Sequence, residues 1–205
     1  MKKKLFAFMA LAATLAATSC QSDEELLQED PQEPTNGTST TGTAPATING
    51  TTVDVKWIQL WKKGPKFAEY NVGVTDDKAE SYGGYYKWEN NIATQSWGSN
   101  WRMPIRVELQ ALLALCDVAW TTVNGVNGLK FTGKGDYSSN SVFLPAAGDC
   151  DFGNVFDQGN CGDYWSSTPA GSEPAYRLRF RSDYQRVYDS LRDIGYSVRA
   201  VLKED

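Results

Sequence analysis

The sequence has no histidine among its 205 residues. Histidine is the general base of Ser-His-Asp and Cys-His catalysis and a common ligand of zinc, so these sites are excluded. No glycine-rich loop follows a strand and opens a helix, which leaves a nucleotide site unsupported. The spacing of four aspartates fits no calcium-binding loop: Asp149, Asp151, Asp157 and Asp163. We therefore expect neither a cofactor nor a metal ion.

Long apolar runs are also missing. The apolar run at residues 5–17 is shorter than the roughly 20 residues that a membrane-spanning helix needs. Three lysines precede this run, and small residues follow it up to Cys20. This arrangement is typical of an export signal that is removed from the mature protein. We expect a signal peptide at residues 1–19.

The segment around Cys20 carries two resemblances. Ala17-Thr18-Ser19-Cys20 resembles a bacterial lipobox, in which the cysteine is lipidated and becomes the new N-terminus. The segment 21–25 that follows contains three acidic residues in a row and resembles the surface-export signal of Bacteroides-type lipoproteins. Together they imply lipidation at Cys20 and an outer-membrane protein that faces the cell exterior. The alternatives are a secreted protein with a spare cysteine and a merely solvated acidic tail.

Residues 20–47 are expected to form a disordered, acidic and threonine-rich tether. They contain almost no large apolar side chains, so they cannot bury enough surface to fold. A flexible segment of this length spans on the order of 30 Å. Residues 48–205 then form one domain by length. Without the three signal lysines and the six tether acids, the formal charge of −5 becomes −2, which gives no reason to bind nucleic acid.

One segment of this domain favours a helix, at residues 104–116. Pro104 suits a first helical turn. Ile105, Leu109, Leu112 and Cys116 recur at spacings of four, three and four, which is helical. The other periodic segments favour short strands joined by long loops, at 53–61, 67–74, 129–132, 141–147, 175–181, 184–188 and 196–202.

The segment 175–181 alternates strictly between two kinds of side chain. Its apolar positions are Tyr176, Leu178 and Phe180, and its cationic positions are Arg177, Arg179 and Arg181. Period two predicts a half-buried strand with the arginines pointing together to solvent. Tyrosine and arginine often dominate the binding energy of interfaces, which favours a recognition face. A charged edge strand that prevents aggregation is the alternative.

Six motifs, in this order, resemble the Fibrobacter succinogenes major paralogous domain, a C-type-lectin-like module: GPKFAEYNVG, YGGYYKW, NWRMPIRVELQALL, FLPAAG, YWSSTP and GYSVRAV. The resemblance covers nearly all of residues 53–202. It implies an α+β fold in which small twisted antiparallel sheets and one main helix support a large face built from long loops. It also implies framework roles for five residues: Trp101, Arg102, Trp165, Tyr196 and Arg199.

Several members of this group are diversified by retroelements, which randomise adenines so that AAY codons yield NNY codons. The resemblance implies variable positions at Arg177, Arg179, Arg181, Tyr184, Arg186, Tyr188, Asp189, Ser190, Leu191, Asp193 and Ile194. The expected ligand-binding set also includes Tyr176 and five residues of the preceding acidic segment, which should lie beside the arginines: Asp151, Phe152, Phe156, Asp157 and Asp163. The arginine row favours a protein or an anionic glycan as ligand.

We therefore expect a monomeric, non-enzymatic binding protein that contacts the membrane only through its lipid. The alternatives are a carbohydrate-binding lectin or a component of an adhesive surface structure, either with a fixed site. A carboxylate-based enzyme is the third reading.

The domain contains three cysteines, at Cys116, Cys150 and Cys161. Cys150 and Cys161 flank ten residues of an exported chain, in which disulfides are permitted. We expect a bridge between them, with two free thiols as the alternative. Cys116 lies on the apolar helical face and is expected to be an inert core thiol.

Overall fold

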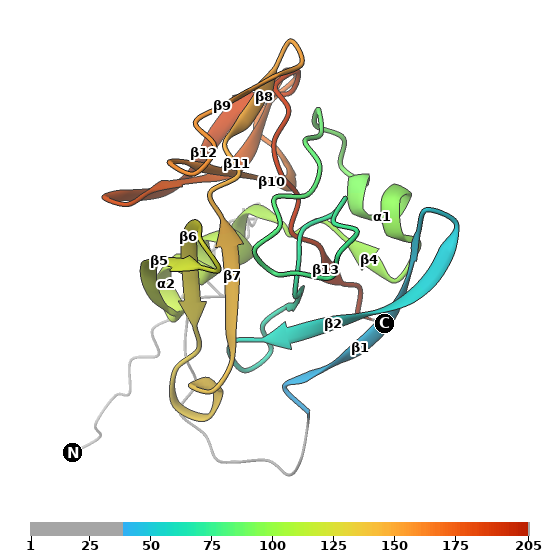
Figure 1. The fold of residues 1–205 in the computed structure, drawn as a ribbon, viewed down its shortest axis with the longest axis vertical. Coiled ribbons are helices and arrows are strands. Elements are labelled where there is room, and N and C mark those ends of the chain that lie inside the picture. Colours follow the sequence, from blue (N-terminus) through green and yellow to red (C-terminus); the bar gives the residue numbers. More distant parts are fainter. Residues whose placement is uncertain (1–38, 205) are drawn as a thin grey trace, which may run out of the picture.

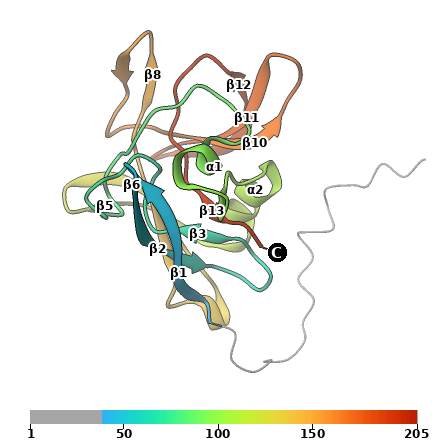
Figure 2. The ribbon, with the colours of Figure 1, turned by 90° about the vertical axis from the view of Figure 1, so that its right-hand side faces the viewer.

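The computed structural model describes residues 39–204. The expected signal peptide, the lipidation site Cys20 and most of the expected tether lie outside the described residues. The described part is an α+β fold of small antiparallel sheets (Figures 1 and 2). Within it, no helix is both long and apolar enough to cross a membrane.

Within residues 39–204, each sheet is antiparallel and the two helices are short. The helices are α1 (Ile92–Trp97) and α2 (Arg106–Leu115), and Gly135–Tyr137 forms a 3₁₀ turn. The five-stranded sheet has the order β1 (Thr41–Ile48), β2 (Thr51–Gln59), β3 (Lys66–Ala68), β13 (Val201–Leu202) and β4 (Trp101–Arg102). A second sheet has the order β5 (Asp117–Val123), β6 (Val126–Thr132) and β7 (Ser141–Pro145). A third has the order β10 (Gly162–Pro169), β11 (Pro174–Arg181) and β12 (Tyr184–Leu191). The fourth is the two-stranded hairpin of β8 (Asp149–Asp151) and β9 (Asn154–Phe156).

The folded domain begins earlier than the sequence predicts. Strand β1 pairs with β2 along its whole length, through a turn at Asn49-Gly50 in which both residues have positive φ, 51° and 78°. Ala44 and Ala46 of β1 are buried. The expected tether boundary at residue 47 is therefore wrong, because small side chains at 41–47 fit closely against larger ones of β2.

Helix α2 confirms the helix expected at 104–116, with a later start. The Ile105 N–H donates to Glu108 Oε2 at 2.8 Å, which satisfies one of the free donors at the helix start. The guanidinium of Arg102 donates two hydrogen bonds, of 2.6 and 2.8 Å, to the same carboxylate. Leu109 and Leu112 are buried as expected, whereas Ile105 precedes the helix and is exposed.

Two apolar clusters form the core. One lies under the five-stranded sheet and contains Trp97 and Trp101, whose rings meet edge to face at 5.4 Å. The other joins α2, the β5–β7 sheet and the β10–β12 sheet, and Tyr164 stacks on Phe180 in it at 5.8 Å. Leu178 and Phe180 are buried as the alternation predicts. This second cluster fixes which face of β11 looks outward.

Arg199 is a buried cross-link between distant segments. Its guanidinium donates to the side-chain oxygen of Asn71 at 2.9 Å and to the carbonyl oxygens of Ala68 at 3.0 Å and Phe143 at 2.9 Å, and also to that of Glu69. Burial lowers the pKa of Arg199 to about 10, so the group stays charged at neutral pH. This geometry agrees with the framework role expected for it.

The C-terminal strands lie together with a projecting hairpin. The hairpin β8–β9 and the β10–β12 sheet occupy one end of the molecule, at the top of Figures 1 and 2, while β1 and β2 lie toward the other end. The acidic segment and the arginine row therefore meet in space, as the sequence predicts.

Candidate functional site

The register of the β10–β12 sheet places the arginines of β11 on one face. Arg177 lies opposite Trp165 of β10 and Tyr188 of β12, and Arg179 lies opposite Asp163 and Arg186. The alternation predicted for this strand is confirmed. The face, however, is covered by residues 149–157 instead of being open to solvent.

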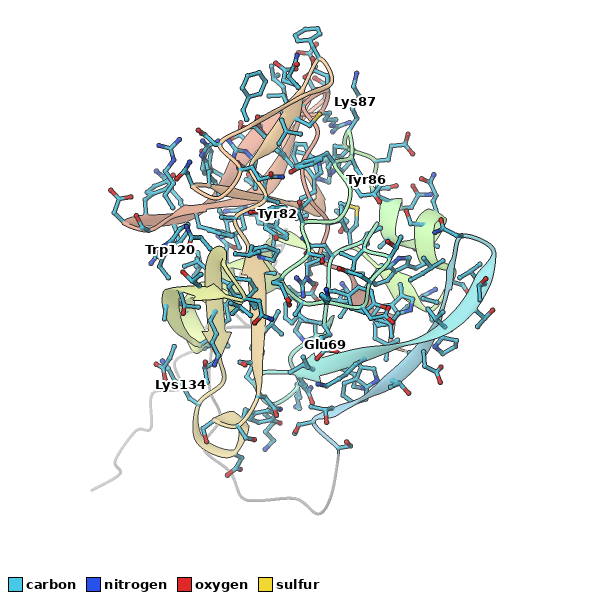
Figure 3. All side chains as sticks on the ribbon, viewed as in Figure 1. Glu69, Tyr82, Tyr86, Lys87, Trp120 and Lys134 are labelled. Carbon is cyan, nitrogen blue, oxygen red and sulfur yellow. The ribbon has the colours of Figure 1, made fainter. Side chains whose placement is uncertain are left out.

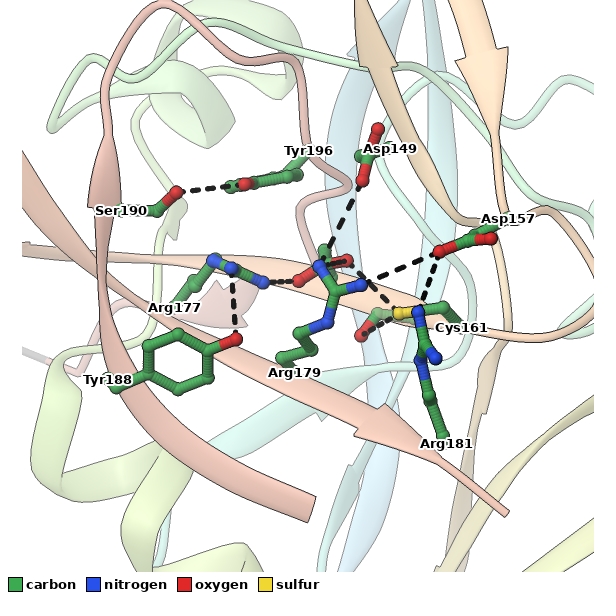
Figure 4. A network of polar contacts seen from close by, with 11 residues as sticks. Asp149, Asp157, Cys161, Arg177, Arg179, Arg181, Tyr188, Ser190 and Tyr196 are labelled. Carbon is green, nitrogen blue, oxygen red and sulfur yellow. Dashed lines mark hydrogen bonds and ion pairs between the residues drawn. The ribbon is translucent and has the colours of Figure 1, made fainter. Parts of the chain in front are cut away.

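Six side chains form an arginine–aspartate ladder between the sheet and this covering segment: Asp149, Asp157, Asp163, Arg177, Arg179 and Arg181 (Figure 4). Arg179 is at its centre. Its guanidinium nitrogens lie 3.2 Å from Asp163, 3.5 Å from Asp157 and 4.0 Å from Asp149. One cation therefore ties Asp149 and Asp157 of the covering segment to Asp163 of β10.

Arg177 is the most buried cation of the ladder. Only 6% of its surface is exposed, and it forms an ion pair with the fully buried Asp163. Its guanidinium also lies between two aromatic rings, 4.6 Å from the centre of Tyr188 and 4.7 Å from that of Tyr196. Such contacts stabilise a desolvated cation.

The expectation that the arginine row points to solvent is wrong for Arg177 and largely wrong for Arg179. The side chain of Arg179 is 18% exposed, whereas that of Arg181, which pairs with Asp157 at 2.9 Å, is 48% exposed. The same burial removes Asp163 from the expected ligand contacts. The physical reason is that these arginines form ion pairs with aspartates of the same protein, which lets them be buried.

The expected disulfide between Cys150 and Cys161 is absent, and both cysteines are free thiols. Cys161 is buried and its Sγ lies 3.3 Å from Asp163 Oδ2. Cys150 instead belongs to β8, and its backbone exchanges two 2.8 Å hydrogen bonds with Gly195. Burial raises the pKa of the Cys161 thiol and raises that of the Cys116 thiol to about 12, which keeps both protonated.

The pKa of the Asp149 carboxyl depends on its burial and on the neighbouring charges. Burial is the main cause that raises the pKa of its carboxyl. Arg179 opposes this rise, and Asp157 adds to it. The raised pKa of Asp149 therefore comes mainly from its burial, against the opposing effect of Arg179.

The tip of the β8–β9 hairpin carries the most exposed large apolar side chain of the described residues. Phe152 is 94% exposed, and with Gly153 it forms a two-residue turn in which both φ angles are positive, 45° and 80°. Such turns favour Asn, Asp or Gly, and an aromatic residue is uncommon there. Val155 and Phe156 on β9 are also exposed.

The remaining expected site residues divide by exposure. Five are exposed, at Tyr184, Arg186, Asp189, Leu191 and Asp193, and Asp157 is exposed within the ladder. Five others are half-buried, at Asp151, Tyr176, Tyr188, Ser190 and Ile194. Tyr176 lies under the Arg106 guanidinium at 4.3 Å, and Ser190 is 2.9 Å from the Tyr196 hydroxyl. These two side chains therefore have partners within the fold.

A cleft of about 260 Å³ opens beside the hairpin tip. It is lined by Tyr85, Lys87, Cys150, Asp151, Phe152, Gly153, Asp193 and Gly195. The sequence did not assign Tyr85 or Lys87 to a site, and both lie in the connection between β3 and α1. A second cavity, of about 340 Å³, lies among β1, β2, β6 and β7.

Within residues 39–204, no three side chains of Cys, Asp or Glu gather closely enough to hold a metal ion. Comparison with known proteins finds no match for this chain among protein-family models, curated proteins or solved structures.

Proposed function

We propose that this protein is a surface-anchored binding protein with a C-type-lectin-like domain. Its recognition face consists of the hairpin tip and the outer residues of the C-terminal segment: Asp151, Phe152, Val155, Phe156, Tyr184, Arg186, Asp189, Leu191 and Asp193. The export-signal pattern and the lipobox-like residues before Cys20 support the anchoring.

The observation that carries this proposal is the placement of Phe152. A phenylalanine with a φ of 45° and 94% exposure gains little from folding and adopts a backbone conformation that bulky residues avoid. Strained positions of this kind cluster at functional sites. Exposed aromatic anchors are also typical of the residues that dominate binding. Phe152 is therefore better explained by contact with a ligand than by the fold.

The arginine–aspartate ladder supports this face without contacting the ligand. It holds the base of the hairpin through Asp149 and the segment after it through Asp157. A binding surface that is already ordered loses less conformational entropy when a partner docks. We therefore assign Arg177 and Arg179 to positioning of the recognition face.

Retroelement diversification would then be confined to exposed positions. Tyr184, Arg186, Asp189, Leu191 and Asp193 are exposed, and exposed residues usually tolerate substitution. Replacement of Arg177, in contrast, leaves the buried Asp163 without a full set of partners. We therefore expect sequence variation at the exposed positions around the ladder and unchanged residues within it.

The test of the proposed function is the variant Phe152→Asn. Asparagine suits the turn, so the melting temperature should stay equal or rise. The full chain is immobilised and probed with a phage-displayed library of random dodecapeptides and with a glycan array. Ligands selected on the unmodified chain should bind Phe152→Asn at least about tenfold more weakly, the effect of one central anchor.

The matched control is Ile105→Asn. Ile105 is also an exposed apolar residue, and it precedes α2, where asparagine is a favourable cap. This control should keep both its stability and its binding. Selected ligands that bind Phe152→Asn as well as the unmodified chain would refute the proposed face.

A further inference from the structure

The cleft beside the hairpin tip has carboxylates at its edge that the fold does not use. Asp151 is half-buried and Asp193 is exposed. Among the described residues, neither side chain has an ion-pair partner. The nearby arginines of the ladder are occupied by Asp149, Asp157 and Asp163. The lining therefore contains two carboxylates against the single ammonium of Lys87.

Lys87 lies at the same end of the molecule as the hairpin and is exposed (Figure 3). A lysine ammonium on a long, flexible stem stays hydrated and is readily displaced from a rim. It therefore leaves the two carboxylates accessible to another cation.

The walls of the cleft are aromatic. Tyr85 is fixed by a hydrogen bond from its hydroxyl to the Ala147 carbonyl and by another from Gln158, at 3.0 Å. Phe152 also lines the cleft. Aromatic faces attract cations, and the protein already uses this contact for Arg192, which lies 4.2 Å from the Trp88 ring centre.

The size of the cleft limits what it can hold. Its volume of about 260 Å³ is below the roughly 300–1,000 Å³ typical of pockets that enclose a whole small molecule. A single long side chain, presented by a larger partner, fits this space better. Cys150 and Gly195, which line the cleft, are paired through their backbones.

We propose that this cleft binds a lysine or arginine side chain of a partner protein. The positive end lies between Asp151 and Asp193, and the aliphatic stem lies against Tyr85 and Phe152. This inference rests on the proposed function and names the chemistry of its ligand. Of the two expected ligand classes, a protein and an anionic glycan, it favours the protein, because the arginines that suggested an anion are neutralised within the ladder.

The experiment uses the full chain and the dodecapeptide library described above. Peptides selected on the unmodified chain should be enriched in lysine and arginine. The double variant Asp151→Asn/Asp193→Asn should bind them about tenfold more weakly, as expected for losing charge-assisted contacts. Lys87→Gln should bind them about twofold to fivefold more tightly, because it removes a competing exposed cation.

The matched control is Asp54→Asn/Asp136→Asn, which changes the net charge equally at exposed positions outside the cleft. It should leave peptide affinity unchanged. Peptides that depend on Phe152 but lack basic enrichment, or that bind the double variant normally, would overturn this inference and leave the proposed function intact. If no selected peptide depends on Phe152 or on the aspartates, both are overturned.

Discussion

Arg177→Ala is expected to lower the free energy of unfolding by about 3–5 kcal/mol, the usual effect of removing one partner from a buried ion pair. Asp163 is fully buried and would keep only Arg179 as a cationic partner. The Tyr188 and Tyr196 rings would also lose the guanidinium that lies between them. The measurement is equilibrium unfolding in guanidinium chloride.

Arg181→Ala is the matched control, because it is the same substitution on the same face of β11. Arg181 is half exposed and pairs with an exposed aspartate, so its loss should cost less than about 1 kcal/mol. Equal losses of unfolding free energy in the two variants would show that the buried arginine of the ladder stabilises the fold no more than the exposed one. If Arg177→Ala leaves the free energy of unfolding unchanged, Arg177 points to solvent, as the sequence predicts.

Arg199→Lys is expected to lower the free energy of unfolding by at least about 1–3 kcal/mol, although it keeps the charge. A lysine ammonium cannot reproduce the flat fork that serves Asn71, Ala68 and Phe143. At least one buried acceptor would lose its donor, and each such loss costs about 1–3 kcal/mol.

The same unfolding measurement on Arg186→Lys gives the control. Arg186 is exposed on β12 and should change stability by no more than about 0.5 kcal/mol. If Arg199→Lys is as stable as the unmodified chain, the guanidinium is not the cross-link between these segments.

Periodicity predicts the elements whose burial is one-sided. Helix α2 and strand β11 both have one apolar face, so spacing alone locates them. Strand β1 cannot be predicted in this way, because its side chains are small and its composition resembles that of a linker. It folds because alanines and a glycine fit where larger groups would not. Gly42, for example, faces the Trp57 ring so closely that an added Cβ would lie 2.6 Å from it.

The candidate site could be predicted only in part. Alternation shows that the three arginines share a face, but it does not show what covers that face. Asp163 belongs to β10, which is not among the strands that periodicity predicts, so the sequence places Asp163 beside the arginines but does not predict its burial against Arg177. Phe152 was included as a candidate, but its positive φ could not be predicted because bulky residues rarely occupy such a turn.

The most direct test of the recognition face is a backbone amide NMR titration of the full chain with a dodecapeptide selected from the library. The largest chemical-shift changes should fall on residues 151–156 and 184–193, with smaller changes along the ladder and none in β1. Changes confined instead to the second cavity, around Lys56, Lys130 and Ser139, would contradict the placement of the ligand at the hairpin tip.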